Sequence, residues 1–80
     1  MHELHMVKHL FEDIIKLAGK NKAEKVNAIY LKMGEFTEIN EEILRLYFQE
    51  KGKDTIAEGA RLNIEKSPTR ELRLVSFDCE

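Results

Sequence analysis

The sequence predicts an α+β fold, in which two helices pack on one face of a three-stranded mixed β-sheet in the order α-β-α-β-β. Two segments place apolar residues three and four positions apart, which is typical of amphipathic helices. Three other segments are rich in β-branched and aromatic residues or alternate apolar with polar ones, which is typical of strands. Two helices on the same face of the sheet would bury both apolar stripes. At 80 residues, the chain has the size of one small domain.

The first helix is predicted from Leu4 to Ala18. Its apolar residues form a single stripe: Leu4, Val7, Leu10, Phe11, Ile14, Ile15 and Ala18. Gly19 and the lysines that follow it indicate where the helix ends. Because Leu4 begins the stripe, this helix anchors the first residues of the chain to the domain.

A strand is predicted over residues 25–33 and a second helix from Glu41 to Gly52. The strand alternates Ile29, Leu31 and Met33 on one face with Ala28, Tyr30 and Lys32 on the other. The helix has Asn40 as its N-cap, and its apolar face consists of Ile43, Leu44, Tyr47 and Phe48. Gly34 and Gly52 indicate where the two elements end.

Two further strands are predicted over residues 60–66 and 71–78, joined as a hairpin by the proline-containing turn at 67–69. In the last strand, Leu72 and Leu74 share one face and Val75 and Phe77 the other. The sheet face away from the helices would then carry Tyr30, Val75 and Phe77. These side chains indicate either ordinary surface exposure or a face for self-association.

Composition excludes several function classes. Thirteen basic and fifteen acidic residues are interspersed, for a net charge of -2, which argues against nucleic acid or a membrane surface as partner. No apolar run is long enough to span a membrane, and we find no signal peptide. The single cysteine, Cys79, favours a reduced, cytoplasmic protein and makes a poor zinc site. No phosphate loop or nucleophile motif is present, so we expect that the protein is not an enzyme.

The first five residues, MHELH, contain a candidate metal-binding unit. The α-amine of Met1, the amide nitrogen of His2 and the His2 ring are nitrogen donors joined by short covalent paths. Such a planar set suits Ni(II) or Cu(II). Glu3, His5 or a partner protein could supply a fourth ligand. The alternative is that the segment is simply solvated.

His2, His5 and His9 follow helical spacing on the side opposite the apolar stripe. They form either a solvent-facing ligand cluster or part of an ordinary polar face. For His9 we favour the polar face. The sequence leaves three roles for His5: a fourth ligand, a group that supports the ligands, or a polar position on an exposed helix face.

Three blocks of the chain together resemble the HypA family, nickel-insertion proteins of NiFe-hydrogenase maturation. They read MHELH, LKMGEFTEINEEILRLYFQ and GKDTIAEGARLNIEKSP. The residues that fit the family motifs are Gly34, Glu35, Glu42, Leu46 or Leu44, Phe48, Thr55, Glu58, Gly59, Ala60, Leu62 and Ile64. Thr37 and Glu41 depart from the usual serine and proline.

The resemblance implies that residues 1–80 form a single nickel-binding domain that binds Ni(II) through Met1, His2 and Glu3. It implies delivery of nickel to hydrogenase, with a HypB-type GTPase and the hydrogenase large subunit as partners. The family's zinc module of two CxxC pairs is missing near residues 67–70, so we expect no zinc. The alternative function is a metal-independent interaction module that forms homo-oligomers.

Overall fold

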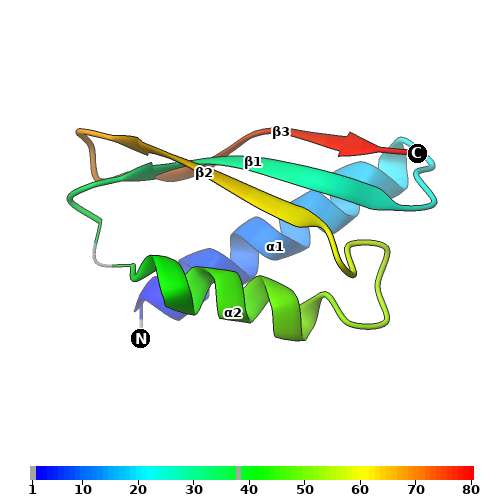
Figure 1. Cartoon of the computed structure of the whole chain (residues 1–80), viewed down its shortest axis with the longest axis horizontal. Coiled ribbons are helices and arrows are strands. Elements are labelled where there is room, and N and C mark those ends of the chain that lie inside the picture. Colours follow the sequence, from blue (N-terminus) through cyan, green and yellow to red (C-terminus); the bar gives the residue numbers. More distant parts are fainter. Residues whose placement is uncertain (1, 38) are drawn as a thin grey trace.

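The computed structural model describes the backbone of residues 2–37 and 39–80, and the side chains of residues 5–37 and 39–80. Its elements are α1 (His2–Lys20), β1 (Val26–Gly34), α2 (Glu41–Lys51), β2 (Arg61–Ser67) and β3 (Leu72–Cys79). The order of the elements and the α+β class are those predicted from the sequence (Figure 1). Asn40 caps α2 as expected, because its side chain accepts a hydrogen bond from the Glu42 N–H.

The strand order is β2-β1-β3, with β1 at the centre of the sheet. β1 pairs with β2 in parallel and with β3 antiparallel, so the predicted mixed sheet is confirmed. The predicted hairpin between the last two strands is wrong, because β2 and β3 lie on opposite edges of β1. The physical reason is that β1 is the most apolar strand, and the central position lets both of its edges form hydrogen bonds while its side chains are buried.

The short turn from β2 to β3 crosses directly over Gly34 at the end of β1. A Cβ atom on Gly34 would lie 2.0 Å from the carbonyl oxygen of Thr69. The Gly34 N–H donates to the Glu71 carbonyl (2.7 Å), and the Glu35 N–H donates to the Ser67 carbonyl (2.7 Å). Glycine is therefore needed here for close approach of two backbones, and the crossing places β3 on the far side of β1.

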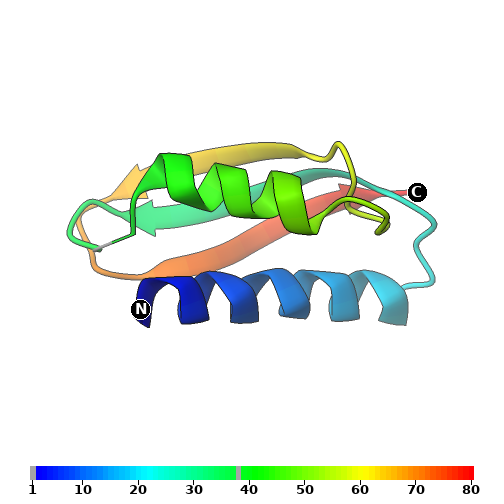
Figure 2. The same ribbon diagram turned by 90° about the horizontal axis from the view of Figure 1, so that it is seen from below.

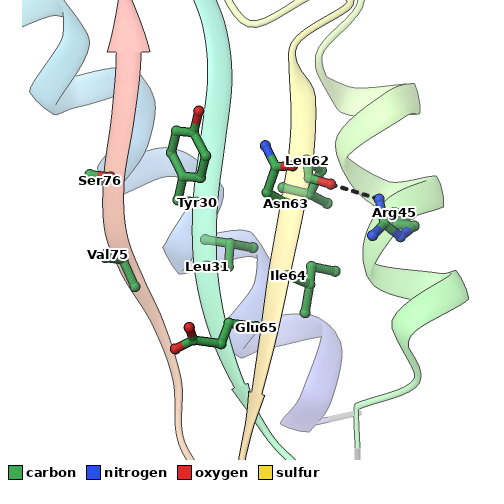
Figure 3. A pocket seen from close by; sticks show the side chains of 9 residues that line it. All are labelled: Tyr30, Leu31, Arg45, Leu62, Asn63, Ile64, Glu65, Val75 and Ser76. Atoms are coloured by element: carbon green, nitrogen blue, oxygen red, sulfur yellow. Dashed lines mark hydrogen bonds between the residues drawn. The ribbon is translucent and has the colours of Figure 1, made fainter.

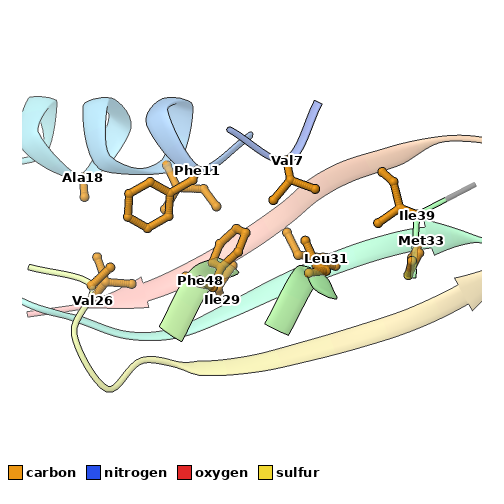
Figure 4. Packing of buried hydrophobic residues seen from close by; sticks show 12 residues of the cluster. Val7, Phe11, Ala18, Val26, Ile29, Leu31, Met33, Ile39 and Phe48 are labelled. Carbon is orange, nitrogen blue, oxygen red and sulfur yellow. The ribbon is translucent and has the colours of Figure 1, made fainter. Parts of the chain in front are cut away.

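Both helices lie on one face of the sheet (Figures 1 and 2), as the sequence predicted. Their apolar sides meet at Phe11, whose ring packs edge-to-face against Phe48 with 5.3 Å between the ring centroids. The buried residues form one cluster between helices and sheet (Figure 4): Val7, Phe11, Ile14, Ala18, Val26, Ile29, Leu31, Met33, Ile39, Leu44, Phe48 and Ala57. From Val7 on, the predicted stripe of α1 is thus the face that builds the core.

Two details of the helices differ from the sequence prediction. α1 continues through Gly19 to Lys20, and the left-handed residue of the following turn is Lys22, with φ of 57°. In α2, Leu44 and Phe48 are buried, but Ile43 is 50% exposed. Only one stripe of this short helix faces the sheet, and Ile43 lies to one side of it.

A β-bulge in β3 corrects the predicted position of Phe77. Tyr30 pairs with Ser76 while the next residue, Leu31, pairs with Leu74, so Val75 is an extra residue. The bulge shifts the alternation by one position, and Phe77 lies opposite the inward-facing Ile29. Phe77 accordingly packs against the core, on the same side as Leu72 and Leu74.

The sheet face away from the helices is therefore less apolar than predicted. Phe77 is absent from it, and Val75 is 53% exposed. The Tyr30 O–H donates to Asp78 Oδ2 (2.9 Å), and this carboxylate raises the pKa of the Tyr30 phenol because it favours the protonated donor. The three-residue apolar face on which the self-association alternative rested is not formed.

A polar network ties α2 to the edge strand β2. Arg45 Nη1 donates to the Leu62 carbonyl (2.8 Å), and Arg45 Nε donates to Glu41 (3.1 Å). Lys66 Nζ lies 3.1 Å from the other Glu41 carboxylate oxygen. The hydrogen bonds from Lys66 and Arg45 hold the pKa of Glu41 below its ordinary value of 4.5.

The backbone crossing at Gly34 predicts a large cost for any side chain there. Gly34→Ala should lower the free energy of unfolding by about 3 kcal/mol, because the new methyl group meets backbone atoms that cannot move aside. Gly19→Ala is the matched control. Its Cβ meets nothing within 4 Å, and the change should stabilise α1 by about 0.5–1 kcal/mol. Urea unfolding of both variants measures the difference; equal stabilities would contradict the crossing.

The bulge predicts that two nearby apolar positions of β3 contribute unequally to stability. Phe77→Ala should cost about 2 kcal/mol, because it opens a hole beside Ile29 in the partly buried edge of the core. Val75→Ala should stay within about 0.5 kcal/mol, because its side chain is largely in solvent. Thermal and urea unfolding test this. A Val75 variant that loses as much stability as the Phe77 variant would mean that the strand has no bulge.

The lowered pKa of Glu41 predicts an acid-sensitive part of the stability. The contribution of this carboxylate is complete above its ordinary pKa of 4.5 and is lost as the pH falls through the lower folded-state value. Glu41→Gln should therefore destabilise the protein near neutral pH and flatten the loss of stability on acidification. Urea unfolding between about pH 7 and pH 2 measures this. Glu42→Gln, on the next residue of the same turn, is the control and should flatten the profile less.

Candidate metal centre

The candidate metal-binding segment stands at the start of α1. α1 and α2 both begin at one end of the molecule, and the turn between β2 and β3 lies at that end too (Figures 1 and 2). Met1 and the side chains of His2 and Glu3, the expected ligands, lie outside the described residues. The backbone of α1 is described from His2 onward.

A helix that begins at His2 leaves its first amides without helical acceptors. The first four N–H groups of any α-helix have no carbonyl four residues earlier to bond to. The amide nitrogens of His2 and Glu3 belong to this group. Coordination of a metal ion by these nitrogens therefore breaks no hydrogen bond of the helix.

His5 lies on the exposed side of α1, where its ring meets that of His9. The two Nε2 atoms are 3.0 Å apart, and the ring centroids are 4.4 Å apart at an interplanar angle of 82°. One ring donates its Nε2–H and the other accepts with its Nε2 lone pair, so the two Nε2 atoms are bonded to each other and the Nδ1 of the donor ring keeps a lone pair. The pairing differs from the expectation for His9, which was a position on an ordinary polar face. The signal that could have paired the two is their spacing of four residues, one helical turn.

The described residues contain no larger ligand cluster. Among the residues that the structure describes, no group of three or more histidine, cysteine or acidic side chains could hold a metal ion. Cys79 is exposed and ends β3 at the end of the molecule opposite the start of α1 (Figure 1). A metal ion at the start of α1 would therefore be held by the terminal segment, by the His5–His9 pair, or by each separately.

An open depression of about 490 Å³ lies across the sheet beside Arg45 (Figure 3). It is lined by Tyr30, Leu31, Arg45, Leu62, Asn63, Ile64, Glu65, Val75 and Ser76. The guanidinium of Arg45 is already bonded to the Leu62 carbonyl and to Glu41. This lining contains neither a nucleophile paired with a base nor a set of metal ligands, so the depression offers no catalytic arrangement.

In the described part of the chain, no helix is both long and apolar enough to cross a membrane.

A family model described as "Hydrogenase/urease nickel incorporation, metallochaperone, hypA" matches residues 1–79. The match spans the terminal MHE segment, both helices and the whole sheet. The description is that of a metallochaperone and not of an enzyme, which agrees with the expectation from the sequence.

Similar proteins carry the same name. The hydrogenase maturation factor HypA of Methanopyrus kandleri is 38% identical over 65 residues, which is 81% of this chain and 46% of that protein. HypA of Methanothermobacter thermautotrophicus is 34% identical over 80 residues, 100% of this chain and 61% of that protein. The chain thus spans about half the length of the curated relatives it matches.

The fold also has a counterpart among solved structures. The solution structure of the Ni metallochaperone HypA from Helicobacter pylori superposes with a TM-score of 0.79, covering 96% of this chain and 96% of that chain. At 15% sequence identity, this likeness concerns the fold alone. Together with the family match over residues 1–79, these relatives identify the chain as a member of the HypA family of nickel metallochaperones.

Proposed function

We propose that this chain binds Ni(II) through Met1, His2 and Glu3 and delivers the ion during the maturation of a NiFe-hydrogenase. The observation that carries the proposal is membership of a nickel-incorporation family over a match that includes these three residues. The names of the relatives, hydrogenase maturation factors, support hydrogenase as the destination.

The chemistry of the terminal segment suits this ion. The Met1 amine, the His2 amide and the His2 ring supply nitrogen donors, and Ni(II) favours planar nitrogen sets of this kind. The Glu3 amide nitrogen fills the fourth position in our proposal, since His5 is engaged with His9. Because α1 begins at His2, these amides can lose their protons without cost to the helix.

We further propose that residues 1–80 act as one nickel-binding domain and that the family's zinc module is absent between β2 and β3. Support comes from the hydrogen bonds of the turn between these strands. Within the turn, Ser67 Oγ lies 2.8 Å from Thr69 Oγ1, and the Thr69 carbonyl accepts a hydrogen bond from the N–H of Phe36, which follows β1 (3.0 Å). In this proposal, the domain folds without zinc. By family membership, its partners are a HypB-type GTPase and the hydrogenase large subunit.

The proposal predicts that nickel binding depends on His2 and on the free amine. Untagged protein titrated with NiCl₂ should develop the visible d–d absorption of a planar nitrogen site. His2→Ala should weaken this site at least about 100-fold, because the chelate loses its ring donor. Acetylation of the amine should abolish the band.

Lys16→Ala, an exposed change on the same helix, is the control and should leave the band unchanged. A His2→Ala protein that develops the planar band at the parent's nickel concentration would overturn the proposed site.

A further inference from the structure

We infer that His5 and His9 form a second metal site on α1, separate from the terminal chelate, which binds Ni(II) through two imidazole Nε2 atoms and completes its coordination with water. The inference does not rest on the proposed function, because neither donor belongs to residues 1–3. It assigns a role to His9 and makes His5 a ligand of this site rather than of the terminal one.

The spacing of the two nitrogens matches a particular coordination geometry. Ligand nitrogens about 2.1 Å from a metal ion lie about 3.0 Å apart at right angles, as in octahedral or square-planar sites. In a tetrahedral site they lie about 3.4 Å apart. The observed Nε2–Nε2 separation is 3.0 Å. The separation is therefore compatible with an ion that takes right-angled ligands, such as Ni(II).

A metal ion can take the place of the shared hydrogen once the donor ring carries its hydrogen on Nδ1, a change of tautomer that needs no rearrangement of the fold. Both rings are exposed, so they can turn until both lone pairs converge on one ion. The backbone between them is held rigid, because Val7 in the same turn is fully buried in the core. A rigid backbone with two adjustable rings loses little conformational entropy on binding.

The two sites are distinct in position and in donor type. The midpoint of the pair lies about 7.5 Å along the helix axis from His2, at about 1.5 Å per residue. Its ligands are side chains alone, so it needs neither the amine nor a deprotonated amide. Among the described residues no third ligand joins the pair, which leaves the remaining positions open to water or to a ligand from a receiving protein.

The experiment uses protein with its amine acetylated, which removes the terminal chelate, and NiCl₂ as the only ligand. We expect one Ni(II) to bind. Octahedral Ni(II) is paramagnetic, whereas planar Ni(II) is diamagnetic, so the His5 and His9 ring signals should broaden in proton NMR spectra. His5→Gln and His9→Gln should each weaken binding at least about tenfold, because each leaves a single imidazole. Lys8→Gln, on the same exposed turn, should change nothing.

Circular dichroism of each variant should show the helix content of the parent, as expected for exposed positions. The inference is overturned if acetylated protein binds no Ni(II), or if His9→Gln binds as tightly as the acetylated parent. His2→Ala separates this inference from the proposed function. Broadening of the His5 and His9 signals without the planar band supports the second site alone, while loss of both signatures would show that the pair depends on the terminal chelate and would overturn the inference.

Discussion

Burial of β1 between two hydrogen-bonded neighbours and beneath two helices is the constraint on which the rest of the structure depends. Ile29, Leu31 and Met33 are almost fully buried, and both edges of the strand are paired. β2 and β3, each only partly buried, therefore take the edges. The chain reaches the second edge by crossing over Gly34, where the absence of a side chain allows the turn to lie against the end of β1.

The same core determines what α1 can offer for function. Val7, Phe11 and Ile14 bind the helix to the sheet, so the opposite side of its first turns must face solvent. His5 and His9 are held there on a backbone that the core keeps rigid, and the proposed terminal chelate sits at the free end of the same helix. A metallochaperone has to bind an ion and also release it to a receiving protein. Ligands on the exposed face of a helix, such as His5 and His9, are accessible to a receiving protein for exchange.

Many features of the fold could be predicted from the sequence, because they depend on interactions between residues close together in the chain. The three-and-four spacing of α1 identified its buried face, and the Asn40 cap and Gly52 located the ends of α2. The MHE segment and the two internal blocks indicated the HypA family. Other features resisted prediction because they depend on contacts between distant residues. Strand order follows from which edges of β1 remain open, and the bulge at Val75 follows from register against β1. Neither leaves a pattern within the strand itself beyond an imperfect alternation.

The sequence by itself determined the kinds of element and their order and indicated candidate nitrogen donors in the MHE segment, because periodicity and covalent connectivity are local properties. Only the tertiary structure decided that β1 lies between β2 and β3, that Phe77 points into the core, and that His5 and His9 hold their Nε2 atoms 3.0 Å apart. These depend on how backbones and rings meet in space. The pairing of the histidines shows the division: the four-residue spacing put them one turn apart, and their orientation on a helix anchored by the core brought the two nitrogens together.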